Sequence, residues 1–394
     1  MPTPLPRAEP ANLGLCPERT QRLVQALQAE VDRGRLPGAV VLLARHGRVA
    51  LFESLGQRDP ATGAAMARDA VFRIYSMTKP VVSVAAMMLV EQGRLLLSDP
   101  VARYLPEFSQ TPVGVETAEG LQLQTVAQPA TLQDLLRHTA GLTYEFLGTA
   151  PVQQLYAQAQ VGSRERSNAE FSRTLAALPL FRPPGTEWAY SRATDVLGRL
   201  LEVVTGQTLG QHLRECIFEP LGMVDTAFVV PEADHGRIAE PFAHDPDGGV
   251  PLRVLDPRQA PAMESGGGGL MSTAADYARF LQCLLNGGEL DGVRLLGPRT
   301  VEFMTADHLG SIPSHDPLLP PGHGFGLGFA VRAATGLATM PGSVGTCHWG
   351  GIAGTTFFVD PAEDFFGILM TQAPNQRDHY RLLFRTLAYA ALVD

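Results

Sequence analysis

The sequence predicts a mixed fold, α/β in the broad sense and α+β in the strict one. Helices flank a central antiparallel sheet, and an all-helical domain is attached. Runs typical of strands lie near both ends of the chain, at 38–56 and between 326 and 371. From about 98 to 221 the pattern is helical. We therefore expect one α/β domain from 1–97 and 222–394, a helical domain from 98–221, and a functional site in the cleft between them.

The elements of the first hundred residues follow from their periodicity. Residues 17–32 repeat aliphatic side chains at helical spacing, and the first two, Pro17 and Glu18, suit a first turn. Two strands flank the polar segment 45–48, which predicts a hairpin. A short strand at 71–74 leads into Ser76, and residues 81–90 are apolar on nearly every face, as in a buried central helix.

The later elements are of three kinds. The segment 224–268 is rich in Pro, Gly and Asp and has little periodicity, and a long irregular segment inside a folded protein often borders a site. A helix is expected at 272–285 with Ser272 or Thr273 as its cap. Strands are expected at 326–332, 346–349, 355–360 and 365–371, with a last helix at 378–392.

Composition excludes several classes of protein. The 394 residues carry a net charge of −9, which argues against a nucleic-acid partner, and 45% are hydrophobic, which argues against disorder. The four cysteines lack metal-site or disulfide-framework spacing, so we expect no metal and no cofactor. With no leader pattern and no apolar stretch of membrane length, we expect a cytoplasmic protein with no membrane partner, while the oligomeric state stays open.

Lys79 is the first residue that chemistry singles out. It is the single lysine among 31 basic residues, the others being arginine. A coding bias toward arginine explains the ratio but not the position that kept a lysine. Because arginine does not lose its proton at working pH, a site that needs a neutral amine must retain lysine.

Ser76 lies three residues before Lys79, at the predicted start of the central helix. Residues at this spacing share a helix face, so a neutral amine could take the proton of the hydroxyl. Burial and the positive helix end both disfavour the ammonium form, and the N–H of Ser76 is free to stabilise an oxyanion. The pattern S-x-x-K is common by chance, and its weight comes from the absence of any other lysine.

Two further segments suit the same acyl-transfer chemistry. Tyr190 precedes a strongly helical stretch and could relay protons, although a tyrosine at such a place is often a packing residue. After the predicted strand at 346–349, Gly350 and Gly351 would let a substrate lie against the backbone, although a plain turn explains them equally well.

These three motifs together resemble the serine β-lactamase and penicillin-binding protein superfamily, and within it the family VIII carboxylesterases that share the class C β-lactamase fold. The matching stretches are Ser76-x-x-Lys79, Tyr190-Ser191-Arg192 and Trp349-Gly350-Gly351, in that order. The resemblance implies that Ser76 is acylated, that Lys79 and Tyr190 exchange the proton, and that the N–H groups of Ser76 and Ile352 form the oxyanion hole.

Two departures from the class C pattern bear on the substrate. Arg192 replaces an asparagine and Trp349 replaces a lysine, so a β-lactam carboxylate loses its usual anchor whereas a neutral ester loses nothing. Trp349, Gly350 and Gly351 are then expected to contact substrate, and His348 is an alternative for the basic position.

The resemblance implies hydrolysis of short-chain carboxylic esters, with a small-molecule ester as partner. β-Lactam or amide hydrolysis, acyl transfer and a non-catalytic penicillin-binding sensor stay open, because one site can serve several acceptors. A Ser-His-Asp hydrolase is disfavoured since no G-x-S-x-G occurs.

Overall fold

A large antiparallel sheet organises one half of the molecule. The computed structural model describes residues 4–394, so residues 1–3 of the predicted 1–97 segment lie outside the described residues. The sheet order is β10-β11-β12-β13-β14-β1-β2-β3, which confirms a sheet assembled from both ends of the chain. Its strands are β1 (Gly38–Arg45), β2 (Arg48–Asp59), β3 (Ala64–Ala65), β10 (His323–Phe325), β11 (Ala330–Arg332), β12 (Cys347–Gly350), β13 (Thr356–Asp360) and β14 (Phe365–Thr371).

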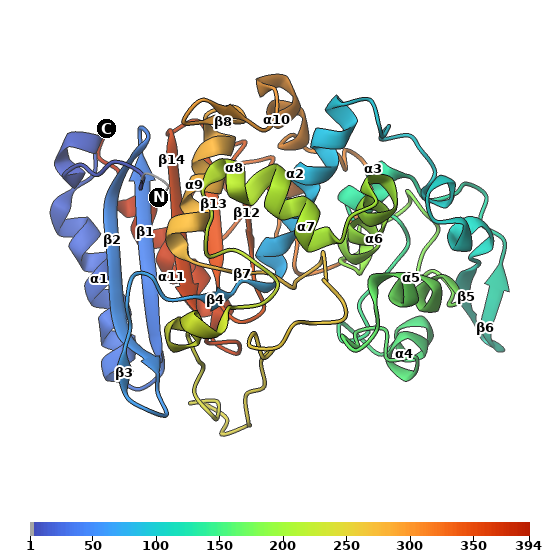
Figure 1. The fold of residues 1–394 in the computed structure, drawn as a ribbon, viewed down its shortest axis with the longest axis horizontal. Helices are drawn as coiled ribbons and strands as arrows, with labels where there is room; N and C mark the ends of the chain where they lie inside the picture. Colours follow the sequence, from blue (N-terminus) through green and yellow to red (C-terminus); the bar gives the residue numbers. More distant parts are fainter. Residues whose placement is uncertain (1–3) are drawn as a thin grey trace.

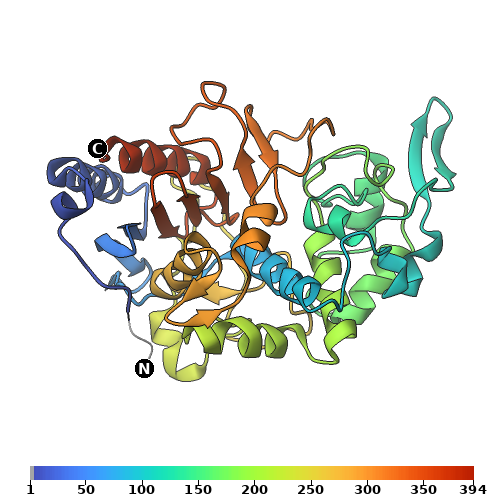
Figure 2. The ribbon, with the colours of Figure 1, turned by 90° about the horizontal axis from the view of Figure 1, so that it is seen from above.

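Helices cover both faces of this sheet. On one side α1 (Pro17–Asp32) lies beside α11 (Arg377–Ala390), and α9 (Ala274–Leu285) packs on the other side (Figures 1 and 2). Because side chains alternate along a strand, Val41 and Leu43 join the core under α1 and α11, while Val40 and Leu42 join the core around α9. The cap of α9 is Thr273, whose Oγ1 accepts a hydrogen bond from the Asp276 N–H at 3.2 Å.

The central helix α2 (Thr78–Glu91) connects this half to the rest of the chain. Nearly all of its side chains are buried, as its apolar sequence predicts, and it packs against the helix α6 (Ala193–Thr205). The short strand β4 (Phe72–Arg73) leads into it and pairs with β7 (Met271–Ser272). Beside these elements lie β8 (Glu289–Leu290), β9 (Val293–Arg294) and α10 (Pro298–Met304).

Helices and loops make up most of the other half, to the right in Figure 1. The helices there are α3 (Leu132–Leu136), α4 (Pro151–Gln158), α5 (Asn168–Ala176) and α6 (Ala193–Thr205). The chain then returns through α7 (Leu209–Leu213), in the middle of Figure 1, to α8 (Glu219–Leu221) beside α9. One hairpin, β5 (Val113–Thr117) with β6 (Gly120–Gln124), interrupts a region predicted to be all helical. Its alternating apolar residues and the turn at Gly120 are a hairpin pattern that the prediction overlooked.

A second difference concerns the predicted strand at 326–332. Only its last three residues form a strand, β11, and residues 326–329 are a tight turn that joins β11 to the preceding strand β10. In this turn the Gly326 N–H donates to the Phe329 carbonyl at 2.8 Å. Gly328 adopts φ 103°, a conformation that favours glycine, so the repeated glycines make a turn instead of a strand interior. Among the described residues, no helix combines the length and the apolar character that crossing a bilayer requires.

Candidate active site

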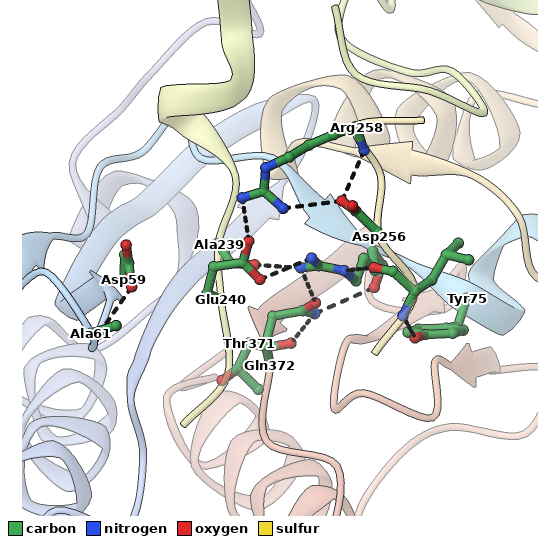
Figure 3. A network of polar contacts seen from close by, with 11 residues as sticks. Asp59, Ala61, Tyr75, Ala239, Glu240, Asp256, Arg258, Thr371 and Gln372 are labelled. Carbon is green, nitrogen blue, oxygen red and sulfur yellow. Dashed lines mark hydrogen bonds and ion pairs between the residues drawn. The ribbon is translucent and has the colours of Figure 1, made fainter. Parts of the chain in front are cut away.

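Ser76 lies on a short 3-10 turn, Tyr75–Met77, directly before α2. The residue before it, Tyr75, has φ 43°, which is strained for a residue with a side chain. The phenol of Tyr75 accepts a hydrogen bond from the Leu255 N–H at 2.8 Å (Figure 3), so the irregular segment 224–268 holds this turn in place.

A buried ion pair fixes the strand that precedes this turn. Arg73 donates to Glu240 at 2.8 Å and to the Ala239 carbonyl at 2.7 Å, and Gln372 from the end of β14 donates to the Arg73 carbonyl at 3.3 Å. Glu240, Gln372 and the outer partner Arg258 lie around this point in Figure 3. The strand leading to Ser76 is therefore tied both to the main sheet and to the segment 224–268.

Lys79 is fully buried in the first turn of α2. Its Nζ lies 3.3 Å from Ser76 Oγ, 2.9 Å from Tyr144 Oη and 2.6 Å from the Gly267 carbonyl oxygen. A neutral amine has two N–H donors and one lone pair. With the donors given to Tyr144 and Gly267, the lone pair is left to face the Ser76 hydroxyl.

Burial lowers the pKa of Lys79 to about 7 and is the largest cause of the shift. The carboxylate of Asp195 opposes the shift, whereas the nearby guanidiniums of Arg192 and Arg164 add to it. The uncharged amine is thus accessible near neutral pH. This is the state that the sequence argument required.

Asp195 orients one of the two acceptors of Lys79. Its buried carboxylate accepts from the Gly267 N–H at 2.9 Å and from Ser265 Oγ at 2.5 Å, and it forms an ion pair with Arg192 at 3.4 Å. The carbonyl oxygen of the same residue, Gly267, accepts the hydrogen bond from Lys79. Arg192, which replaces the expected asparagine, also pairs with Glu145 and lies over the Tyr144 ring.

Tyr190 lies just before α6, with its ring centre 4.6 Å from Lys79 Nζ. Burial raises the pKa of its phenol well above the usual value, against hydrogen bonds from Ser76 and Trp349 that lower it. The Trp349 Nε1–H donates to Tyr190 Oη at 3.1 Å. Tyr190 is therefore a neutral phenol in contact with the hydroxyl, the amine and the indole.

The end of β12 approaches the turn that carries Ser76. A Cβ on Gly351 would come within 2.4 Å of the Ile74 carbonyl oxygen and 2.5 Å of Thr355 Oγ1. Glycine is thus needed for the contact between the two backbones, a reason that the sequence did not reveal. Ile352 follows as an exposed residue whose N–H makes no hydrogen bond within residues 4–394.

His348 is separated from the other predicted residues. It is adjacent to Trp349 on β12, so the two side chains lie on opposite faces of the sheet. Its ring contacts His323, with centroids 5.0 Å apart, and burial lowers its pKa well below the usual value. The hypothesis that His348 supplies a basic group to the substrate does not agree with this position.

A cation does reach this strand, but from a helix. Arg381 on α11 donates to the Gly351 carbonyl at 2.5 Å and lies next to Gly350. No sequence pattern linked this arginine to the site. Tyr144, Asp195 and Gly267 were missed for a similar reason, since the contacts of Lys79 cross 65 and 188 positions of sequence.

An alcohol, a buried amine of lowered pKa and a neutral phenol, gathered beside an antiparallel sheet, define a protein of the active-site serine class. The comparison with known families agrees. The chain belongs to the family described as Beta-lactamase, whose model matches residues 21–390.

Individual relatives extend this similarity over most of the chain. Protein Rv1367c of Mycobacterium tuberculosis is 37% identical over 86% of this chain and 87% of its own length. Esterase EstB of Burkholderia gladioli is 34% identical over 89% of both chains. Among solved structures, EstCE1, described as a hydrolase with promiscuous acyltransferase activity, superposes with a TM-score of 0.82 at 31% identity and covers 94% of this chain and 98% of its own. The predicted fold and the resemblance to family VIII carboxylesterases are confirmed.

Proposed function

We propose that this protein is a serine carboxylesterase that hydrolyses short-chain carboxylic esters through an acyl-Ser76 intermediate. The observation that carries the proposal is the placement of Lys79, whose amine lies 3.3 Å from Ser76 Oγ with its other two contacts occupied by acceptors. Relatives named as esterases support the same activity.

Acylation begins when Ser76 Oγ attacks the ester carbonyl and Lys79 takes the hydroxyl proton. The carbonyl oxygen becomes negative and is stabilised by the N–H groups of Ser76 and Ile352. Tyr190 donates a proton to the departing alcohol oxygen and regains one from Lys79, so the C–O bond of the ester breaks and no net proton is consumed.

Hydrolysis of the acyl-enzyme reverses these roles. A water molecule loses its proton to the Lys79 and Tyr190 pair as its oxygen attacks the acyl carbon. The bond between the acyl carbon and Ser76 Oγ then breaks, and the serine recovers its proton. Trp349, Gly350 and Gly351 border this position and are proposed to contact the substrate, with Trp349 as an apolar wall.

The test is mass spectrometry of the intact protein during turnover of a p-nitrophenyl ester. We expect a transient mass increase equal to one acyl group, localised to the peptide that contains Ser76. Ser76→Ala should abolish both the adduct and the turnover, whereas Ser109→Ala, an exposed serine elsewhere in the chain, should change neither. Turnover by Ser76→Ala at the wild-type rate would refute the proposal.

Acyl transfer to an alcohol is a second candidate, favoured by the description of EstCE1 as a hydrolase with promiscuous acyltransferase activity. Any acceptor hydroxyl that replaces water at the acyl-enzyme would give an ester in place of an acid. Product analysis with a primary alcohol added to the esterase assay distinguishes the two. A new ester that requires Ser76 indicates transfer, and acid alone indicates hydrolysis.

A further inference from the structure

A group of basic side chains lies on the face of the sheet opposite to Trp349. His323 on β10 is the cross-strand neighbour of Arg332 on β11, and His348 on β12 shares this face because Ala330 pairs with it. Helix α11 packs over the same face of the sheet and contributes Arg385. Four basic side chains from four elements therefore gather between the sheet and α11.

The two arginines of this group lack the partners that buried arginines normally have. Five arginines are buried among residues 4–394, and three of them form ion pairs with carboxylates, namely Arg45, Arg73 and Arg279. Arg332 and Arg385 have no carboxylate within 4 Å in that range. Since a buried charge is costly unless it is paired, this pair of cations calls for a compensating negative charge.

The hydrogen bonds that these side chains do make leave donors unused. Arg332 Nη1 donates to the Met340 carbonyl at 2.8 Å, and Arg385 Nε donates to the Pro341 carbonyl at 3.1 Å. Arg332 Nε and Arg385 Nη2 are buried without a partner within residues 4–394, as are the Nε2 atoms of both histidines. Four unpartnered nitrogens in one cluster are far from the usual satisfaction of buried polar groups.

Backbone geometry shows that the guanidiniums converge. A Cβ on Gly342 would lie 2.9 Å from Arg385 Nη2, 3.3 Å from Arg332 Nη1 and 3.3 Å from Thr346 Oγ1. Two cations and a hydroxyl thus meet beside a residue that has no side chain. An acceptor with several oxygens could be reached from each of them.

The acidic group whose charge acts on Arg385 is already engaged in hydrogen bonds. Asp360 on β13 accepts from Tyr389 Oη at 2.6 Å, Thr346 Oγ1 at 2.9 Å and the Ser343 N–H at 3.0 Å. It influences Arg385 at longer range, and Arg385 also contacts the Tyr389 ring. Arg381, the remaining charged neighbour on α11, adds a further positive charge.

We propose that His323, Arg332, His348 and Arg385 bind a small tetrahedral oxyanion of the phosphate or sulfate kind. Three or four oxygens and a double negative charge match two guanidiniums and two imidazoles. His323 Nδ1–H donates to the Pro321 carbonyl at 3.2 Å, so its Nε2 donates to the anion in the imidazolium form, which a bound dianion favours. The burial of the unpartnered nitrogens favours a compact anion over a large ligand, and the source is either the free ion or a phosphorylated small molecule. Because β12 carries both His348 and Trp349, the bound anion would also stabilise the strand at the active site.

The test measures thermal unfolding of the Ser76→Ala protein, so that the result does not depend on the proposed esterase activity. At constant ionic strength, replacing chloride by about 10 mM phosphate should raise the Tm by about 3 °C or more, because a ligand that binds only the folded state stabilises it. Phenyl phosphate separates the two sources, since a compact buried site for the free ion excludes the phenyl group. No shift with either compound would overturn the proposal.

Variants locate the effect. Arg385→Gln and, as a milder change, His323→Gln should each reduce the phosphate-dependent shift by at least half, whereas Arg299→Gln, an arginine whose side chain is 89% exposed, should retain it. If Arg385→Gln does not fold, phosphorus NMR gives a second readout. The phosphate signal should be broadened by the wild-type protein and should sharpen in His323→Gln. An equal shift in all three variants would place the anion elsewhere and refute this site.

Discussion

The pKa of the Lys79 amine is set by burial and by the charges around its nitrogen. Burial lowers its pKa, Asp195 partly restores it, and Arg192 and Arg164 lower it further. The lowered pKa, to about 7, means that the protonated form dominates below neutrality and the neutral form above it. The rate of a reaction that needs the neutral amine must follow this titration.

We therefore expect kcat/KM for a p-nitrophenyl ester to rise with pH and to level off above an apparent pKa near 7. Below that value the logarithm of kcat/KM should fall by one for each pH unit, as for one essential base. Lys79→Arg should abolish turnover across the whole range because the guanidinium stays charged. A flat profile between pH 5 and 8, with full activity of the arginine variant, would remove Lys79 as the base.

Asp195 offers a separate test of the same balance. Its negative charge favours the ammonium form of Lys79, so Asp195→Asn should lower the pKa of the amine and move the acid limb to lower pH by about one unit or more. A role in packing alone would reduce activity equally at all pH values. Glu170→Gln, a change at the exposed carboxylate that caps α5, serves as the control and should leave the limb in place.

Tyr190 is the third group at this centre. Tyr190→Phe should lower kcat by about a hundredfold or more, the usual size of a general acid-base contribution, while KM changes little. Tyr144→Phe removes a different phenol next to the same amine and shows whether any loss is specific. An unchanged kcat in Tyr190→Phe would assign this tyrosine to packing.

Among single residues, the sequence predicted the reacting groups better than the side chains that surround them. Ser76 and Lys79 are close because their spacing fits a helix start, which a local pattern can reveal. Tyr144 and Asp195 reach the site only through the tertiary fold, and no spacing could place them there. His348 illustrates the converse, since its neighbour Trp349 is at the site while the alternation of the strand turns His348 away.

Elements position these groups through contacts between backbones. β12 approaches the turn of Ser76 so closely that Gly351 has no room for a side chain. From the sequence, the paired glycines at this strand end were interpreted as room for a substrate against the backbone. Similarly, the sequence predicted a strand at 326–332, whereas Gly326 and Gly328 lie in the turn between β10 and β11, which only the pairing of these two strands reveals.

Gly351→Ala should consequently separate β12 from Ser76. The added Cβ must move away from the Ile74 carbonyl by several tenths of an ångström or more, which displaces the Ile352 N–H from the proposed oxyanion hole. We expect kcat/KM to fall by about 10- to 100-fold, a usual cost of such misplacement. Gly236→Ala is the matched control, because a Cβ there meets nothing within 4 Å. Equal activity of both variants would contradict the role of Gly351.

The whole molecule joins the two proposed domains through one buried core. Val40 and Ile368 of the sheet belong to the same cluster as Leu135 and Leu200 of the segment 98–221, with residues of α2 between them. The predicted boundaries at 97/98 and 221/222 describe how the chain is arranged, and we propose that they do not separate two independently stable units. Ser76 and Lys79 come from one side of this junction, and Tyr144 and Tyr190 come from the other.

The two tryptophans make this proposal measurable, because each side of the junction holds one. Trp188 lies in the segment 98–221 and Trp349 on β12, and both are buried, so each should change its emission on unfolding. In Trp349→Phe only Trp188 reports, and in Trp188→Phe only Trp349 reports.

If the core couples the two halves, the fluorescence midpoint in urea must equal the far-ultraviolet circular dichroism midpoint within each variant. Because both midpoints come from the same variant, the effect of the substitution on stability cancels. This includes the loss of the hydrogen bond from Trp349 to Tyr190 in Trp349→Phe. Fluorescence midpoints that fall on opposite sides of the dichroism midpoint in the two variants would mean that the halves unfold separately, and that the site at their junction is lost before the more stable half.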